Sequence, residues 1–77
     1  MDSNYTEKVE KVLKRIRENR KLKGFSHENM AGMLDMSVSA YNKLERNETT
    51  LSFERLLCIT DALEIPLSEI LDIKTGD

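Results

Sequence analysis

The sequence has little of several residue types, and each shortage excludes a class of protein. Its 77 residues include one cysteine, one histidine, one proline and no tryptophan. A lone cysteine, Cys58, excludes an intramolecular disulfide and a cysteine-based metal cluster. No stretch approaches the roughly 18 uncharged apolar residues that a membrane span requires, and the start of the chain lacks the apolar run of a signal peptide. We therefore expect an intracellular protein with one domain over residues 1–77 and no cofactor.

The same shortages leave no set of side chains for catalysis. The single histidine, His27, has no second polar cluster beside it in the sequence, and no glycine-rich phosphate loop occurs. A nucleophile, a base and an orienting group therefore cannot be assigned, and metal binding lacks ligands for the same reason. We predict that the protein is not an enzyme and holds no metal.

The charge is nearly balanced overall but uneven along the chain. Twelve Lys and Arg residues stand against 14 Asp and Glu residues, which gives a net charge of −2. Residues 1–25 hold eight bases and four acids, whereas residues 26–77 hold four bases and ten acids. The basic run is either the solvated face of a helix or a surface that steers the protein toward phosphates. Because the net charge is slightly negative, any attraction to phosphates must come from a local basic patch.

Apolar periodicity predicts an all-α chain of five helices and no strand. The first helix spans about residues 6–22 and ends at Gly24. Its buried stripe follows the i, i+3, i+4, i+7 spacing and consists of Val9, Val12, Leu13 and Ile16.

Two short amphipathic helices follow within residues 26–47. Ser26 and Ser37 each supply an N-cap, Asp35 suits a left-handed residue in the turn between them, and Asn47 suits a left-handed helix end. The residues predicted to face inward are Met30, Ala31, Leu34, Ala40, Tyr41 and Leu44. Because the turn is so tight, the helices must cross steeply, and this spacing is typical of a DNA-binding helix-turn-helix.

The last two helices complete the predicted core, which spans about residues 6–72 between frayed ends that include residues 74–77. Ser52 caps the fourth helix, which runs to Leu63, and Pro66 suits the first turn of a short fifth helix that ends at Leu71. The fourth helix is apolar around much of its circumference, through Phe53, Leu56, Leu57, Ile59, Ala62 and Leu63. We expect it to be central to the core, with its less buried side against another subunit.

The third helix has a polar face opposite its apolar residues. Four side chains that can bind a base edge or a phosphate lie at offsets of zero, three, four and seven, namely Ser39, Asn42, Lys43 and Arg46. An ordinary solvated helix face has the same composition. The tightly crossed pair of helices to which it belongs favours the interpretation that this face binds DNA.

A buried ion pair is also predicted. Arg20 falls on the same stripe as Leu13 and Ile16, so its guanidinium needs a partner. Glu45 follows Tyr41 by four residues on the third helix and offers a carboxylate that arginine can bind through two hydrogen bonds. We expect an Arg20–Glu45 pair that fixes the third helix against the first.

From about residue 16 to residue 71 the sequence resembles the helix-turn-helix domain of the phage Cro and repressor type, also called the XRE family. The matching pieces are IRENR at 16–20, SHENMA at 26–31, MSVSAYNKLER at 36–46, SFERLL at 52–57 and ALEIPLSEIL at 62–71. The resemblance implies a compact five-helix, lambda-repressor-like DNA-binding domain whose third helix enters the major groove.

The resemblance also assigns DNA contacts to particular positions. Base contacts fall on Val38, Ser39, Asn42 and Lys43. Phosphate contacts fall on Lys23, Ser26, His27, Ser37, Arg46, Asn47 and Thr49. The family usually has glutamine where this chain has His27, and an imidazole would bind phosphate more strongly at mildly acid pH; an exposed, inert histidine is the alternative. The family's arginine–glutamate pair falls on Arg20 and Glu45.

These observations predict a sequence-specific transcriptional regulator, a repressor, in a bacterial or phage-type cytoplasm. Residues 26–53 hold two bases against four acids, so we expect one copy to bind DNA weakly and two copies to read an inverted repeat as a homodimer. The candidate dimer contacts are Leu51, Cys58 and Ile65. The alternative is a protein-interaction module of the same fold, such as the antitoxin of a toxin–antitoxin pair.

Overall fold

The structure is a computed structural model that describes residues 3–71, without the side chains of the first two of them. These residues form five helices, which are α1 (Ser3–Leu22), α2 (His27–Leu34), α3 (Val38–Glu45), α4 (Phe53–Leu63) and α5 (Leu67–Leu71). No strand occurs in this range. The predicted all-helical class and helix order are confirmed, and the fraying expected at residues 74–77 lies outside the described residues.

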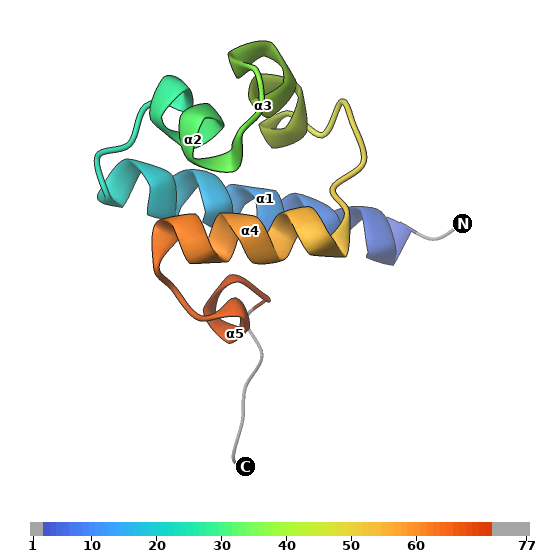
Figure 1. The fold of residues 1–77 in the computed structure, drawn as a ribbon. Helices are drawn as coiled ribbons and strands as arrows, with labels where there is room; N and C mark the ends of the chain where they lie inside the picture. The colour runs from blue at the N-terminus through green and yellow to red at the C-terminus, as the bar shows by residue number, and fades with distance from the viewer. Residues whose placement is uncertain (1–2, 72–77) are drawn as a thin grey trace.

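Two longer helices form the centre of the molecule. Figure 1 shows α1 and α4 crossing the middle, with α2 and α3 packed on one side and α5 on the other. All five helices contribute to one buried apolar cluster, which consists of Leu13, Ile16, Met30, Ala31, Leu34, Tyr41, Leu44, Leu56, Ile59, Leu63 and Ile70. The pair α2 and α3 is therefore fixed on a shared core.

Three helices begin at a serine that caps them. The hydroxyls of Ser26, Ser37 and Ser52 each accept a hydrogen bond of 3.0 Å from the backbone N–H three residues later. At α2 a second hydrogen bond completes a capping box, in which Oδ1 of Asn29 accepts from the N–H of Ser26 at 2.9 Å. The predicted N-caps are confirmed, and they satisfy N–H groups that a helix start leaves without partners.

Four helices end in the same way, with one residue in the left-handed conformation. These residues are Gly24, Asp35, Asn47 and Glu64, with φ between 57° and 77°. The next residue's N–H donates to the carbonyl five positions back, at 2.8 to 3.1 Å, which is the Schellman pattern. The predictions for Asp35 and Asn47 are confirmed. Glu64 was not predicted, because glutamate has no local preference for this conformation.

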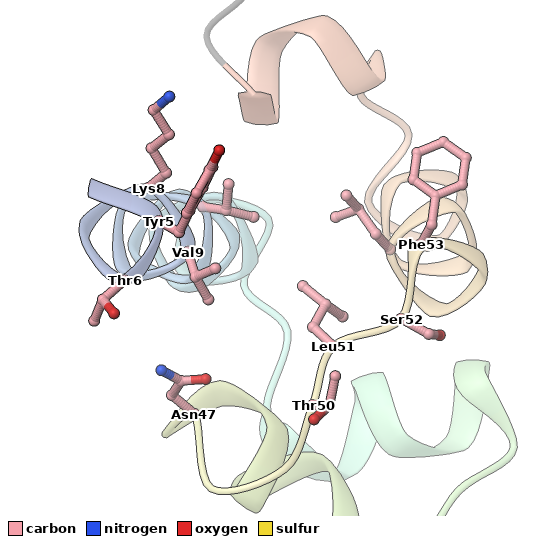
Figure 2. A pocket seen from close by; sticks show the side chains of 11 residues that line it. Tyr5, Thr6, Lys8, Val9, Asn47, Thr50, Leu51, Ser52 and Phe53 are labelled. Carbon is pink, nitrogen blue, oxygen red and sulfur yellow. The ribbon is translucent and has the colours of Figure 1, made fainter. Parts of the chain in front are cut away.

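Three expectations about the helices are wrong in detail. Helix α1 begins at Ser3 rather than near residue 6, and Val9 on its predicted buried stripe is 39 % exposed. Val9 is exposed because the start of α1 lines a groove instead of packing against the core (Figure 2). Pro66 precedes α5 instead of lying in its first turn, and its carbonyl accepts from the N–H of Glu69 at 3.0 Å.

The apolar circumference of α4 is only partly buried. Leu56, Ile59 and Leu63 face the core, whereas Phe53 is 64 % exposed and Leu57 is 41 % exposed. The described helices cover one side of α4, and the side with Phe53 and Leu57 has no helix packed on it. The prediction of a helix central to the core with one less buried side is therefore confirmed, whereas the contact of that side with another subunit stays a prediction.

Candidate nucleic-acid interface

The unit formed by α2 and α3 is held by backbone geometry and by one arginine from α4. The left-handed Asp35 turns the chain between the helices, and Ala31 is buried where they pack. Arg55 donates from Nη1 to the carbonyl of Leu34 at 3.1 Å, at the end of α2. Its guanidinium satisfies a carbonyl that the end of a helix would otherwise leave without a partner. The position of α2 relative to α4 is therefore fixed at this turn.

A buried carboxylate at the end of α3 joins three helices. Glu45 is 3 % exposed, and its Oε2 accepts a charge-assisted hydrogen bond of 2.7 Å from Nε of Arg20 on α1. The hydroxyl of Tyr41 donates to the same oxygen. Nε2 of His27, the first residue of α2, lies 3.3 Å from Oε1. We call these four residues the Glu45 cluster. The predicted Arg20–Glu45 pair is present, whereas the other two partners were not predicted.

Further bonds extend the Glu45 cluster to the backbone. Arg20 donates from Nη1 to the carbonyl of Phe25 at 2.9 Å, and Arg17 donates from Nη1 to the carbonyl of Glu45 at 3.0 Å. Burial, together with the hydrogen bond to Glu45 and its negative charge, raises the pKa of the Tyr41 hydroxyl far above its ordinary value. The hydroxyl therefore stays a proton donor throughout the neutral range. The four-residue spacing of Tyr41 and Glu45 on one helix was the available signal for this contact.

The opposite face of α3 is open. Ser39, Lys43 and Arg46 are exposed, and Val38 is 36 % exposed at the edge of the face. No hydrogen bond or ion pair joins the side chain of Ser39 or Lys43 to residues 3–71. Three of the predicted polar side chains therefore share one accessible surface, which we call the α3 outer face: Ser39, Lys43 and Arg46.

Asn42 lies at the boundary of this face rather than within it. Its side chain is half-buried, and its Oδ1 is buried without a hydrogen-bond partner among the described residues. The helical turn places Asn42 between the outer face and the buried Glu45, which explains the difference from the prediction. An unpaired buried carbonyl oxygen is costly, so the amide favours any rotation that exposes this oxygen to a donor.

The seven predicted phosphate positions differ in what already occupies them. Lys23 and Thr49 are exposed, and Ser26 and Ser37 are exposed serines whose hydroxyls cap α2 and α3. The other three have protein partners. His27 contacts Glu45, Arg46 lies 3.2 Å from Oε2 of Glu48, and Asn47 donates from Nδ2 to Oε2 of Glu10 at 2.9 Å.

The three candidate dimer residues differ in exposure and surroundings. Leu51 is half-buried and lines a groove between α1 and α4. Cys58 is exposed beside Arg55 and Asp61, in hollows on another side of α4. Ile65 is half-buried and packs against the core. Leu51 and Cys58 therefore line different hollows, and a dimer contact through these residues stays a prediction.

The match to a known family decides what this arrangement represents. A family model described as helix-turn-helix matches residues 16–70, more than two thirds of the chain, and its range contains α2, the turn and α3. The chain belongs to the helix-turn-helix family of the Cro and repressor type. This helix-turn-helix protein is a DNA-binding regulator, and α3 is the second helix of its motif.

The other two comparisons identified no similar protein. No match was found among curated proteins or among solved structures. Within residues 3–71, no helix of the helix-turn-helix protein has the length and apolar character that crossing a bilayer needs.

Proposed function

We propose that this helix-turn-helix protein is a transcriptional repressor that reads a specific DNA operator with α3 in the major groove. The observation that carries the proposal is the division of α3 into two faces. Glu45 and Tyr41 hold the helix from behind, while Ser39, Lys43 and Arg46 stand exposed in front. A helix that is anchored on one face and exposed on its polar face fits the major groove, where base edges present distinct patterns of donors and acceptors.

Each base-contacting position has a chemistry that suits it. Lys43 can donate to the O6 and N7 of guanine, Ser39 can bond to any base edge, and the methyl groups of Val38 can contact a thymine methyl. Asn42 can pair with adenine once its amide rotates outward. That rotation would release the buried, unpaired Oδ1, so DNA would give this oxygen the partner that the protein lacks.

Phosphate contacts would surround this reading face. The N-terminal ends of α2 and α3 offer backbone N–H groups beside Ser26 and Ser37. Lys23, His27, Arg46, Asn47 and Thr49 complete the proposed set. Arg46 and Asn47 would first have to leave Glu48 and Glu10, respectively.

A homodimer strengthens this weak single-copy interface. The motif region from residue 26 to residue 53 has two bases and four acids, so one copy attracts DNA poorly. Two copies can read half-sites about 34 Å apart on one face of the duplex. If a dimer neutralises about six phosphates, the logarithm of affinity falls with the logarithm of salt at a slope near −5.

The proposal is tested by selecting bound sequences from a random duplex library and measuring Lys43→Ala against the selected site. We expect an inverted repeat, and a loss of about 5-fold to 150-fold in affinity for that site, since a good base contact discriminates by about 1–3 kcal/mol. Affinity for a random duplex should change much less. Lys14→Ala removes an exposed lysine from α1 and serves as the matched control.

The second candidate is a protein-interaction module, for which the acidic composition of residues 26–71 is the supporting observation. That segment holds three bases and eight acids. If the duplex library yields no enriched sequence, this candidate is favoured. An antitoxin that binds a toxin would be one example of such a module. The double variant Asn42→Ala with Lys43→Ala separates the two, because it should abolish selective DNA binding and leave a protein partner on another face bound.

A further inference from the structure

The Glu45 cluster reaches the molecular surface through one of its members, the imidazole of His27. The side chain of His27 is 41 % exposed, whereas that of Glu45 is 4 % exposed, and the other two members, Arg20 and Tyr41, are buried. The sequence alone left open whether this histidine is inert. In the structure its imidazole connects a buried carboxylate with solvent at the start of α2, among the proposed phosphate contacts.

The two carboxylate oxygens of Glu45 have different partners. Oε2 accepts from Nε of Arg20 at 2.7 Å and from the hydroxyl of Tyr41. Oε1 has one hydrogen-bond partner among residues 3–71, which is Nε2 of His27 at 3.3 Å. The ring of Tyr41 also lies beside the imidazole, with ring centres 5.9 Å apart and planes inclined by 51°. Contacts with both Glu45 and Tyr41 therefore orient the imidazole.

These contacts decide which ring nitrogen of His27 carries a hydrogen. A carboxylate oxygen can only accept hydrogen bonds, so Nε2 must carry a hydrogen to bond with Oε1 of Glu45. A neutral imidazole has a single N–H, which leaves Nδ1 as an acceptor. Nδ1 has no hydrogen bond to residues 3–71. The opposite tautomer would place a lone pair of Nε2 against a carboxylate oxygen, which is unfavourable.

The same rule applies to a DNA phosphate, whose charged oxygens accept hydrogen bonds. Nδ1 of a neutral imidazole cannot donate to such an oxygen while Nε2 donates to Glu45. An imidazolium is a donor at both nitrogens. Once Nδ1 takes up a proton, His27 can therefore donate to the buried carboxylate and to a phosphate at the same time.

Charged and titratable groups from three helices face the imidazole or its partners. Glu45 of α3 and Arg20 of α1 form an ion pair whose charges cancel, and Tyr41 stays a neutral donor. Arg17 of α1 donates to the carbonyl of Glu45, and Glu28, next to the imidazole on α2, is exposed. Among the described residues, no ionisable side chain of α4 or α5 is bonded to these groups. A protonated imidazole therefore gives the Glu45 cluster a net positive charge, which a phosphate would neutralise.

We propose that Glu45 is a positioning residue for DNA binding, which turns Nδ1 of His27 outward and makes its phosphate contact depend on the uptake of one proton. This role rests on the proposed function, which places a phosphate beside His27. Since proton uptake and DNA binding favour each other by the same factor, affinity for DNA should rise as pH falls. His27 is the only histidine of the chain, and histidine is the side chain whose ordinary charge change falls between pH 5 and pH 8.

The test measures affinity for the selected operator at constant salt between about pH 5.5 and pH 8, in the wild type and in His27→Gln. We expect the wild type to bind at least about fivefold more tightly at the lower pH, since a charged donor makes the stronger hydrogen bond. A glutamine amide can donate to Glu45 or to a phosphate without taking up a proton. The affinity of the variant should therefore change by less than about twofold over this range.

Lys23→Ala is the matched control. Lys23 is exposed four residues before His27 and belongs to the proposed phosphate contacts. Because lysine stays charged throughout this pH range, its loss should weaken binding by the same factor at every pH. Thermal unfolding of each variant establishes that it is folded at the pH values used.

A second measurement needs no variant. The NMR signals of the single histidine can be followed against pH in the free wild type and in its complex with the operator duplex. If DNA binding requires the imidazolium, these signals should titrate at higher pH in the complex.

Either of two results would overturn the inference: the same pH dependence of affinity in the wild type and in His27→Gln, or histidine signals that titrate alike with and without the duplex. Failure of the proposed function has a different signature. An operator that is selected and lost in Lys43→Ala, without pH dependence from His27, would keep the repressor and refute the proton-linked contact. No selected operator at any pH would refute the repressor, and this role of Glu45 with it.

Discussion

Both faces of α3 hold polar residues, but their surroundings differ. On the inner face Glu45 and Tyr41 are buried and bonded to each other, and to Arg20 and His27 from neighbouring helices. On the outer face Ser39 and Lys43 are exposed and have no bonded side-chain partner among residues 3–71. The polar groups of the inner face are already satisfied by the protein, whereas those of the outer face remain available to a ligand. One helix of eight residues is thus anchored on one face and accessible on the other.

This division makes stability and recognition separable. Changing an inner-face group leaves a buried charge or hydroxyl without its partner, which is costly. Changing an outer-face group exposes or removes atoms that water already contacts, so the free energy of unfolding should barely move. Variants on the two faces should therefore fall into two classes, and the predictions below order them by size.

The largest effect is expected for Arg20→Ala. It leaves the carboxylate of Glu45 buried without its main cationic partner, so the free energy of unfolding should fall by about 3–5 kcal/mol. Urea unfolding measures the loss. Arg46→Ala is the control on the outer side, because its ion pair with Glu48 is exposed and should contribute less than about 1 kcal/mol. Equal losses in the two variants would remove the distinction between the faces.

A smaller effect is expected for Tyr41→Phe, which removes one donor to Glu45 and should cost about 1–3 kcal/mol. The pH dependence identifies the cause. Folding raises the pKa of the Tyr41 hydroxyl, so the unfolded chain loses this proton first as pH rises. The wild type should therefore lose stability above about pH 10, by up to about 1.4 kcal/mol per pH unit from this group.

The phenylalanine variant should lack that alkaline loss. Comparing the two proteins by urea unfolding at several pH values between neutral and alkaline isolates the contribution of Tyr41 from other groups that titrate there. If the free energy of unfolding falls with pH in the same way for both proteins, the hydroxyl is not the protected donor that the geometry indicates.

The smallest and most closely matched comparison uses two serines at the start of α3, one in its N-cap position and one in its first turn. Ser37→Ala removes the N-cap and should lower the free energy of unfolding by about 1 kcal/mol. Ser39→Ala should change it by less than about 0.5 kcal/mol and should weaken selective DNA binding instead. Thermal unfolding and a duplex-binding titration on both variants measure the two effects. Loss of stability at Ser39 would show that this serine belongs to the anchored side.

The sequence predicted those features that depend on local chemistry. The serine caps were predictable because hydroxyls satisfy helix N–H groups, and the left-handed Asp35 and Asn47 because short polar side chains tolerate that conformation. Arg20 and Glu45 were predictable since a charge on an apolar stripe needs a partner. His27 could not be added to that pair, because its contact depends on how α2 crosses α3.

The remaining errors share another cause, which is that periodicity does not show what covers a face. The apolar pattern of α4 predicted one less buried side without showing which residues form it, and the structure leaves Phe53 and Leu57 exposed. The spacing of Asn42 placed it on the outer face, whereas its carbonyl oxygen is buried in the structure. Both outcomes depend on neighbours that are distant in the sequence.

The exposed pair of Arg46 and Glu48 has a consequence for how such a protein would search a genome. An arginine that already holds a carboxylate gains less from a passing phosphate, because the two anions compete for one guanidinium. This competition weakens attraction to DNA of any sequence more than it weakens contacts to base edges. A chain with a net charge of −2 would then dissociate quickly from random DNA and remain bound mainly where its reading face matches.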